Sequence, residues 1–379
     1  MKQPTNNALQ KLRVLHRLHK GLINIMPLQT GGILTDAAKQ ALIEFGDGYS
    51  LCDFCLGSLC EVTNPPVREF VHELLPQFLG CDIATITYGA RDGIFMVMHS
   101  LTKPGDLIIV DGNRHYTTIV AAERVGLDVI EIPHSGYPEF KIDVSDYIPV
   151  IRKHNPKLIL LTYPDGNYGN LPDAAKLGEI AREYDVPYIL NGAYAVGRMP
   201  VRMDDIGADF IVGSGHKSMA SAGPCGVLGM KKRWAEIILR KSELFNNKEV
   251  ELLGCALRGV PLATLMASFP EVAERVNHWD EQVSEAQWFS TELEKLGFKQ
   301  LGENPHRHDL LHFEAPMLYD ISKRVRQRGY FLYHELKDRG IWGPQPGRTK
   351  ALKLSTFAAD KEQLAFVIDS FKAILSKYS

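Results

Sequence analysis

Lys217 is the residue whose setting in this chain most clearly indicates chemistry. It follows the apolar run Phe210–Gly213 and the small polar residue Ser214, and His216 precedes it directly. A lysine at the exit of a buried strand is poorly solvated, which lowers its pKa and makes its amine a nucleophile. An imine-forming lysine beside small phosphate donors is what binding of pyridoxal 5′-phosphate (PLP) requires. Taken alone, the segment also fits a solvated lysine in an ordinary turn.

Four other segments follow predicted strands and carry residues suited to the same cofactor. They are Gly89–Arg91, Asn113–Thr117, Asp165–Asn170 and Asn191–Tyr194. Amides at Ala90 and Arg91 would open a helix and could surround a phosphate. His115 could stack on a pyridine ring, and Asn167 could donate to a phenolic oxygen, although polar turns explain each residue equally well. Because ligands of parallel α/β sheets bind at the carboxyl ends of the strands, the four loops and Lys217 together predict one site.

The composition is that of an ordinary globular protein. The chain has 379 residues, 45% of them apolar and 23% charged, and a net charge of −2. This length favours two domains, and the balanced charge gives no general attraction to nucleic acid. The start Met1-Lys2-Gln3-Pro4 lacks an apolar signal segment, and no apolar run has membrane-spanning length. We therefore expect a cytoplasmic protein that does not enter membranes.

The pattern of elements predicts an α/β fold with a mainly parallel sheet. Strands are expected at 82–87, 107–110, 129–133, 158–163, 188–190 and 210–213, and helices at about 5–20, from Thr35 or Asp36, and at 90–101. Apolar strands alternating with helices are typical of a parallel sheet covered on both faces. After Glu249 the pattern changes to long helices, strands at 309–314 and 351–356, and a final helix from Lys361. We expect a large PLP-binding domain with the N-terminal segment over 1–248 and a small α+β domain over 249–379.

Two sets of motifs carry a family resemblance. Tyr88-Gly89-Ala90-Arg91, His115-Tyr116, Asn167, Gly192-Ala193-Tyr194 and Gly215-His216-Lys217 resemble the aminotransferase-like (fold type I) PLP enzymes, near the cysteine desulfurases. Pro27-Leu28-Gln29-Thr30-Gly31-Gly32, Cys52-Asp53-Phe54-Cys55, the run from Asn191 to Pro200 and Glu251-Leu252-Leu253-Gly254-Cys255 resemble the O-phosphoseryl-tRNA:cysteinyl-tRNA synthase family. The resemblance covers nearly the whole chain.

The resemblance implies a reaction and roles for the residues. Sulfur would replace the phosphate of phosphoserine esterified to tRNA, with PLP on Lys217 and with His115 over its ring. Ala90, Arg91, Asn167, Asn191, Ser214 and His216 would complete the cofactor site. Arg91 and His216 are also candidates for the substrate phosphate. A homodimer, a sulfur donor and phosphoseryl-tRNA synthetase are the implied partners.

The cysteines are expected to handle sulfur. Six are present, too few and too unevenly spaced for a disulfide scaffold. In the family, the thiols matching Cys52, Cys55 and Cys255 are associated with a persulfide or an iron–sulfur cluster. Two thiols in a CxxC pair give an incomplete ligand set, which Cys255 would complete. Cys60, Cys81 and Cys225 are expected to be structural.

Two positions depart from the wider superfamily. Asn191 stands where most relatives have an Asp that keeps the pyridine nitrogen protonated, so the cofactor should be a weaker electron sink unless a neighbouring acid compensates. Lys353 lies nearest the place of an Arg that clamps a free carboxylate, which an ester substrate lacks. Arg348 and Lys350 could meet tRNA backbone, as could Arg13, Arg17 and Lys20; a solvated surface explains these cations as well.

Two other readings stay open at this point. A cysteine desulfurase or a free O-phosphoserine sulfhydrylase would share the PLP site but act on a free amino acid. Such enzymes should keep the carboxylate-clamping Arg, and desulfurases usually keep the ring-nitrogen Asp. A non-enzymatic iron–sulfur or tRNA-binding scaffold would not require Lys217 and four cofactor loops.

Overall fold

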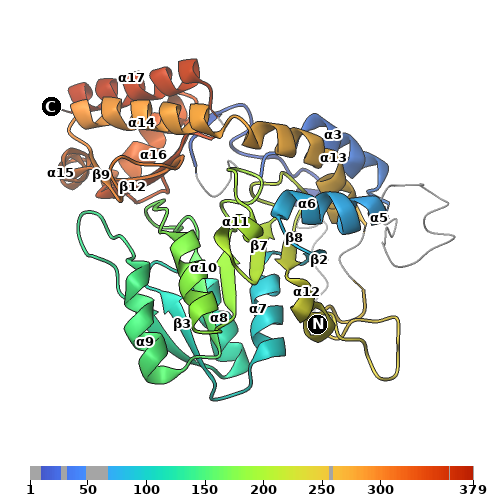
Figure 1. The fold of residues 1–379 in the computed structure, drawn as a ribbon. Coiled ribbons are helices and arrows are strands. Elements are labelled where there is room, and N and C mark those ends of the chain that lie inside the picture. Colours follow the sequence, from blue (N-terminus) through green and yellow to red (C-terminus); the bar gives the residue numbers. More distant parts are fainter. Residues whose placement is uncertain (1–9, 27–31, 48–66, 256–258, 358, 379) are drawn as a thin grey trace, which may run out of the picture.

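A seven-stranded sheet forms the centre of the molecule (Figure 1). The structure is a computed structural model that describes residues 10–26, 32–47, 67–255, 259–357 and 359–378. In spatial order the strands are β2 (Ile83–Thr87), β8 (Gly226–Met230), β7 (Phe210–Ser214), β6 (Tyr188–Asn191), β5 (Leu158–Thr162), β3 (Leu107–Asp111) and β4 (Asp128–Ile132). β8 is antiparallel to both β7 and β2, and the other neighbouring pairs are parallel. The prediction of a mainly parallel α/β sheet is therefore confirmed, whereas β8 was not predicted.

Helices cover both faces of this sheet because its strands are apolar on both sides. One face carries α7 (Ala90–Leu101), α8 (Tyr116–Val125) and α12 (Lys232–Ile238). The other carries α6 (Leu75–Leu79), α9 (Tyr147–His154), α10 (Ala174–Glu183) and α13 (Val260–Val276). Side chains alternate along each strand, so that Ile108 packs in the first core and Ile109 in the second.

A third core belongs to the C-terminal part of the chain, drawn in orange and red in Figure 1. It surrounds the antiparallel strands β12 (Ala351–Ser355), β10 (Leu310–Glu314) and β9 (Lys299–Leu301). The helices of this unit are α14 (Trp279–Lys295), α15 (Pro316–Arg324), α16 (Phe331–Asp338) and α17 (Lys361–Lys377). We call this part the C-terminal unit.

Residues on each side of the predicted domain boundary pack in the core of the other part of the chain. Ile25 packs in the core of the C-terminal unit, next to the short strand β1 (Ile23–Asn24), which pairs with β11 (Ile341–Trp342). Leu262 and Val272 of α13 pack in the core of the large sheet. The division between residues 248 and 249 stays a prediction.

The N-terminal elements agree only partly with the sequence. Thr35 caps α3 (Asp36–Glu44) by accepting from the Ala38 amide, as its position predicted. The helix expected at about 5–20 differs, because residues 12–22 form turns and coil. Leu12, Leu15 and Leu18 are exposed there, so this stretch lacks the buried apolar face that stabilises a short helix.

Candidate active site

A cavity of about 310 Å³ lies at the carboxyl edge of the large sheet. Its lining comes from the ends of β5, β6 and β7, from the starts of α7 and α8, and from the loops between them. The lining residues are Ala90, Arg91, Ile94, His115, Tyr116, Thr117, Thr162, Pro164, Gly166, Asn191, Ala193, Tyr194, Ser214, His216 and Lys217. Predicted cofactor residues from four separate segments therefore converge on one space, and Gly166 of a fifth predicted loop joins them.

Lys217 lies just beyond β7, and its Nζ is 4.3 Å from the centroid of the Tyr194 ring. Burial, together with the positive charges of Arg91 and Arg198, lowers the pKa of Lys217 to about 8. A much larger fraction of this amine is therefore neutral near pH 8 than for an exposed lysine. A neutral, partly buried amine is what attack on an aldehyde requires.

The start of α7 forms a cradle of backbone amides, the kind of site that phosphates bind. Gly89 has a φ of 121° and directly precedes Ala90, where the first turn of the helix has amides without intrahelical acceptors. The β8 backbone passes so close that a Cβ on Gly226 would lie 2.4 Å from the Gly89 carbonyl carbon. The two glycines allow strand and helix to meet, and the donors that result fit the phosphate of PLP.

Two histidines border this cradle and the cavity. His216 packs against Gly89, since a Cβ there would be 3.4 Å from its Cε1, and its Nδ1 lies 2.8 Å from the Cys225 carbonyl oxygen. His115 caps α8, and its Nδ1 accepts from the Thr117 amide at 3.3 Å. Burial, aided by Lys217 and other nearby cations, lowers the pKa of His115 to about 4. His115 is therefore neutral at pH 7, as a ring that stacks on a pyridine should be.

Asn191 ends β6 and is 3% exposed. Its Oδ1 accepts from the Ala193 amide at 3.3 Å, which leaves the Nδ2 amino group as a donor. None of the described residues that line the cavity carries a carboxylate. Two acids outside that lining are buried close to it: Asp111 at the end of β3 accepts from the Thr162 amide at 2.8 Å, and Asp165 lies between the lining residues Pro164 and Gly166. Among the described lining residues, Asn191 is therefore the strand-end side chain available to a ring nitrogen without a carboxylate beside it.

Asn167 does not line this cavity. It lines a second chamber instead, together with His312, Arg348 and Lys353. Its backbone oxygen accepts from the His312 ring at 3.0 Å. The contact from its side chain to a cofactor oxygen stays a prediction.

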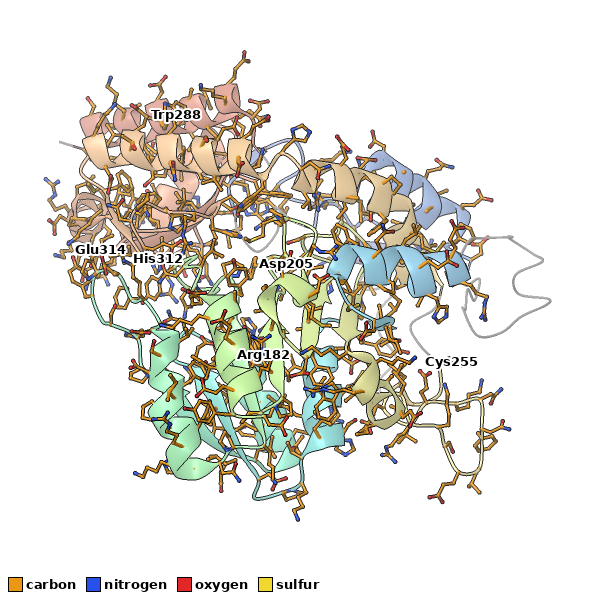
Figure 2. The ribbon with its side chains drawn as sticks, viewed as in Figure 1. Arg182, Asp205, Cys255, Trp288, His312 and Glu314 are labelled. Carbon is orange, nitrogen blue, oxygen red and sulfur yellow. The ribbon has the colours of Figure 1, made fainter. Side chains whose placement is uncertain are left out.

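The predicted sulfur-handling cysteines are only partly described. Cys52 and Cys55 lie outside the described residues. Cys255 is half-buried, and Lys248 Nζ lies 3.2 Å from its Sγ (Figure 2). Within the described ranges, no group of three His, Cys, Asp or Glu side chains is arranged to hold a metal. The predicted unit of three thiols stays a prediction.

The other described thiols have different surroundings. Cys225 is buried, Cys81 is half-buried, and burial raises the pKa of each to about 12. Both therefore stay protonated and poorly nucleophilic at neutral pH. This environment agrees with a structural role.

Sequence reasoning missed several lining residues. Thr162 ends β5, between the strands that end in Asp111 and Asn191, and Tyr194 places its ring against Lys217. Thr162 lies in the apolar run predicted as a strand, so it was not considered as a site residue. Its position at the end of that strand could have indicated it. Tyr194 lay in a quoted motif but was given no role, because only the tertiary structure brings its ring to the lysine.

The described part of the chain has no helix long and apolar enough to cross a membrane. The architecture is that of aminotransferase-like, fold type I enzymes. A solved cysteine desulfurase from Thermococcus onnurineus superposes with a TM-score of 0.76 over 94% of this chain and 95% of its own, at 16% identity. At that identity the likeness shows the fold alone. Fold and lysine-centred cavity together define the class, a PLP-dependent enzyme of fold type I.

Comparison at higher identity narrows the class. The family model for O-phosphoseryl-tRNA(Sec) selenium transferase (SepSecS) matches residues 58–372. An O-phospho-L-seryl-tRNA:Cys-tRNA synthase from Methanosarcina mazei is 56% identical over 379 residues, covering 98% of each chain. The solved SepCysS–SepCysE N-terminal domain complex contains a chain that is 45% identical and covers 100% of both, with a TM-score of 0.93. The chain belongs to the SepSecS family, together with these O-phospho-L-seryl-tRNA:Cys-tRNA synthases.

Proposed function

We propose that this enzyme converts O-phosphoseryl-tRNA to cysteinyl-tRNA by a PLP-dependent β-replacement that uses a sulfur donor and releases phosphate. One observation carries the proposal. Lys217, whose pKa is lowered, lies in a cavity whose described lining has cationic and amide donors and no carboxylate, in a chain 56% identical to a protein named for this conversion.

The cofactor is assigned to the cavity residues that suit each of its parts. Lys217 would hold PLP, the start of α7 at Ala90 and Ser214 at the end of β7 would bind its phosphate, and His115 would cover its ring. Asn191 would donate to the ring nitrogen. When bound, PLP acidifies the hydrogen on the substrate α-carbon. We assign Asn167 a contact to its phenolic oxygen as a further proposal.

The protein's own groups would move protons and bind the leaving group. The Lys217 amine would be the general base for the α-hydrogen, because it is neutral over a large part of the population near pH 8. Arg91 and His216 border the same cavity and would hold the leaving phosphate. A weak hydrogen bond from Asn191 to the ring nitrogen would be sufficient for this reaction, because phosphate is a good leaving group and an ester acidifies its α-hydrogen.

Sulfur delivery is assigned to Cys52, Cys55 and Cys255, as a persulfide or around an iron–sulfur cluster. Cys255 lies in a separate pocket from Lys217, on a segment whose Leu244 and Leu253 are 87% and 97% exposed. A homodimer would cover those side chains and bring thiols of the two copies together. Its partners would be the sulfur donor and phosphoseryl-tRNA synthetase. A protein of the SepCysE kind is a further candidate, since the solved relative is a complex with one.

A product assay tests this function against a free amino-acid sulfhydrylase. The PLP-loaded protein would receive sulfide and either phosphoserine esterified to tRNA or free phosphoserine. We expect cysteine on the tRNA and little free cysteine. Faster turnover of free phosphoserine would contradict the proposal, and desulfuration of free cysteine would favour the desulfurase instead.

A further inference from the structure

A second chamber of about 370 Å³ adjoins the active-site cavity, with which it shares a wall. Gly166 lines the cavity and the next residue, Asn167, lines the chamber. Lys353, which also lines the chamber, donates from Nζ to the Gly166 carbonyl at 2.5 Å. A single peptide segment therefore separates the two spaces, and a ligand longer than one amino acid can reach both.

The chamber offers a flat ring and apolar side chains. His312 stacks on Tyr168 at 5.3 Å, and Tyr168 stacks on Phe140 at 4.1 Å. Burial, and the charge of Lys353, lower the pKa of His312 to about 4, so its ring is neutral at pH 7. Met26 also lines the chamber. A neutral ring held from behind by stacked aromatics is a surface suited to a nucleobase.

The polar groups of the chamber suit the rest of a nucleotide. Asn167 and Gln345 place amides in the lining, where they can meet base edges. Arg348 and Lys353 supply two cations, and the described part of the lining contains no carboxylate. The two cations would attract a dicarboxylate as well as a phosphate, but only a nucleotide uses the stacked ring, the amides and the cations together.

A row of exposed cations continues from the chamber over the C-terminal unit. Arg326 and Arg328 precede Gly329, which lies against Gly347 so closely that a Cβ on Gly329 would be 2.7 Å from the Gly347 oxygen. This contact brings Arg328 and Arg348 onto adjoining segments. We call Arg326, Arg328, Arg348 and Lys350 the basic rim. In the described part of the chain, none of the four forms an ion pair with an acidic side chain.

We propose that the second chamber binds the 3′-terminal nucleotide of the substrate tRNA and that the basic rim binds the phosphates of the acceptor end. The inference rests on the proposed function, because the phosphoseryl group is esterified to the terminal ribose. Only a few bonds separate the reacting carbon from that ribose, so the terminal nucleotide must occupy space next to the cavity. The second chamber, with its stacking ring and cations, is that space.

Binding of tRNA at several salt concentrations tests the rim. The PLP-loaded protein is titrated with the phosphoseryl-tRNA in Arg348→Glu, Arg328→Glu and Lys153→Glu variants. Lys153 is an exposed cation on α9, away from the C-terminal unit in Figure 1, and serves as the matched control. We expect each rim variant to weaken binding by about tenfold and to reduce the slope of log Kd against log salt by about one. Unchanged affinity and slope in both rim variants would show that the basic rim does not bind the phosphates of the tRNA.

A shortened tRNA tests the chamber. Removing the terminal adenosine from uncharged tRNA should weaken binding to the wild-type protein. Gln345 is an exposed loop residue, so Gln345→Trp can fill the chamber with little strain. This variant should bind intact and shortened tRNA equally, with unchanged cofactor absorbance. If the variant still binds intact tRNA more tightly than shortened tRNA, as the wild-type protein does, the chamber does not bind the terminal nucleotide. Failure of the wild-type protein to bind any phosphoseryl-tRNA would instead count against the proposed function itself.

Discussion

At the scale of single residues, the site depends on how burial changes proton affinity. Lys217, His115 and Asn191 each lie where a strand ends, so each is partly removed from water while backbone groups fix its direction. Burial lowers the pKa of Lys217 and of His115, because both would carry positive charge in a poorly solvated place. The result is a neutral amine and a neutral ring in one cavity at a pH where their exposed counterparts would be more highly protonated.

Cofactor attachment should report the lowered pKa of Lys217. The amine reacts only when neutral, so the rate of PLP uptake by cofactor-depleted protein should rise with pH, with a midpoint at about 8. The ordinary lysine value is 10.5. Stopped-flow absorbance measured between about pH 6 and 10 gives the pH dependence of the uptake rate. Arg91→Met should move the midpoint upward, since one nearby cation is removed.

Lys217→Ala is the control for that experiment. It should show no absorbance band of attached cofactor and no turnover. A wild-type midpoint at the ordinary lysine value would show that Lys217 is solvated in the protein, and full activity of Lys217→Ala would end the PLP assignment.

Asn191→Asp should strengthen the cofactor as an electron sink. A carboxylate would hold the ring nitrogen protonated, and a hydrogen bond to a charged group is worth about 1 kcal/mol more than a neutral one. We expect side transamination, measured as pyridoxamine phosphate formed per turnover, to rise by about fivefold to tenfold. Asn191→Gln, which stays neutral, is the control. An unchanged yield of pyridoxamine phosphate in the Asp variant would mean that this position does not tune the ring.

At the scale of elements, the meeting of β8 with the start of α7 shapes the backbone cradle to which we assign the cofactor phosphate. β8 is the one strand of the sheet that runs against its neighbours, and it presents Gly226 to the α7 side and Gly229 to the opposite side. Both glycines are crowded, but by different groups. Gly226 faces the backbone of Gly89 and Ala90, whereas Gly229 faces the side chains of Cys81 and Ile211.

Gly226→Ala should therefore loosen the phosphate cradle. The added methyl must push the α7 amides away, so we expect PLP affinity to fall by about tenfold, along with a stability loss of about 1 to 3 kcal/mol from overpacking. Gly229→Ala should lose comparable stability but retain PLP affinity. PLP titration and chemical unfolding of both variants separate the two effects. Equal loss of PLP affinity in both variants would show that the close contact of Gly226 with α7 has no special role in PLP binding.

At the scale of the whole molecule, sulfur transfer would join segments that are far apart in the chain. Cys255 lies in a pocket with Lys248 and the exposed Phe245, apart from the residues that line the Lys217 cavity. In Figure 2, Cys255 lies on the opposite side of the view from His312 of the C-terminal unit. Cofactor chemistry and sulfur chemistry should therefore be separable by substitution.

Cys255→Ser should lower the rate of cysteine formation with the physiological donor by a factor of about 10² or more. PLP should stay bound, and phosphate release should remain measurable. The thiol is needed only to carry sulfur, so the steps before sulfur attack are spared. Cys81→Ser is the matched control, because Cys81 is also half-buried but has a pKa raised to about 12. Mass spectrometry of the tRNA-linked product and a phosphate assay give the two readouts. Equal sensitivity at Cys81, or wild-type product from Cys255→Ser, would exclude the assigned role.

The sequence by itself determined the parallel strands, their order along the chain and the residues at their ends. Runs such as Leu158–Thr162 are apolar on both faces, and that pattern is local, so it can be read without the fold. The cofactor loops were found for the same reason, since a parallel sheet places all its carboxyl ends at one edge. This was enough to predict Lys217, His115 and Asn191 as one site.

Only the tertiary structure decided which groups surround that site. β8 enters the sheet antiparallel from a late position in the chain, and no local pattern predicted that its glycines would meet Gly89. The second chamber combines Asn167 with Arg348 and Lys353, which lie about half the chain away, because the C-terminal unit packs over the strand ends. Contacts between distant segments depend on the free energy of packing the whole chain, whereas periodicity and turn chemistry depend on neighbouring residues alone.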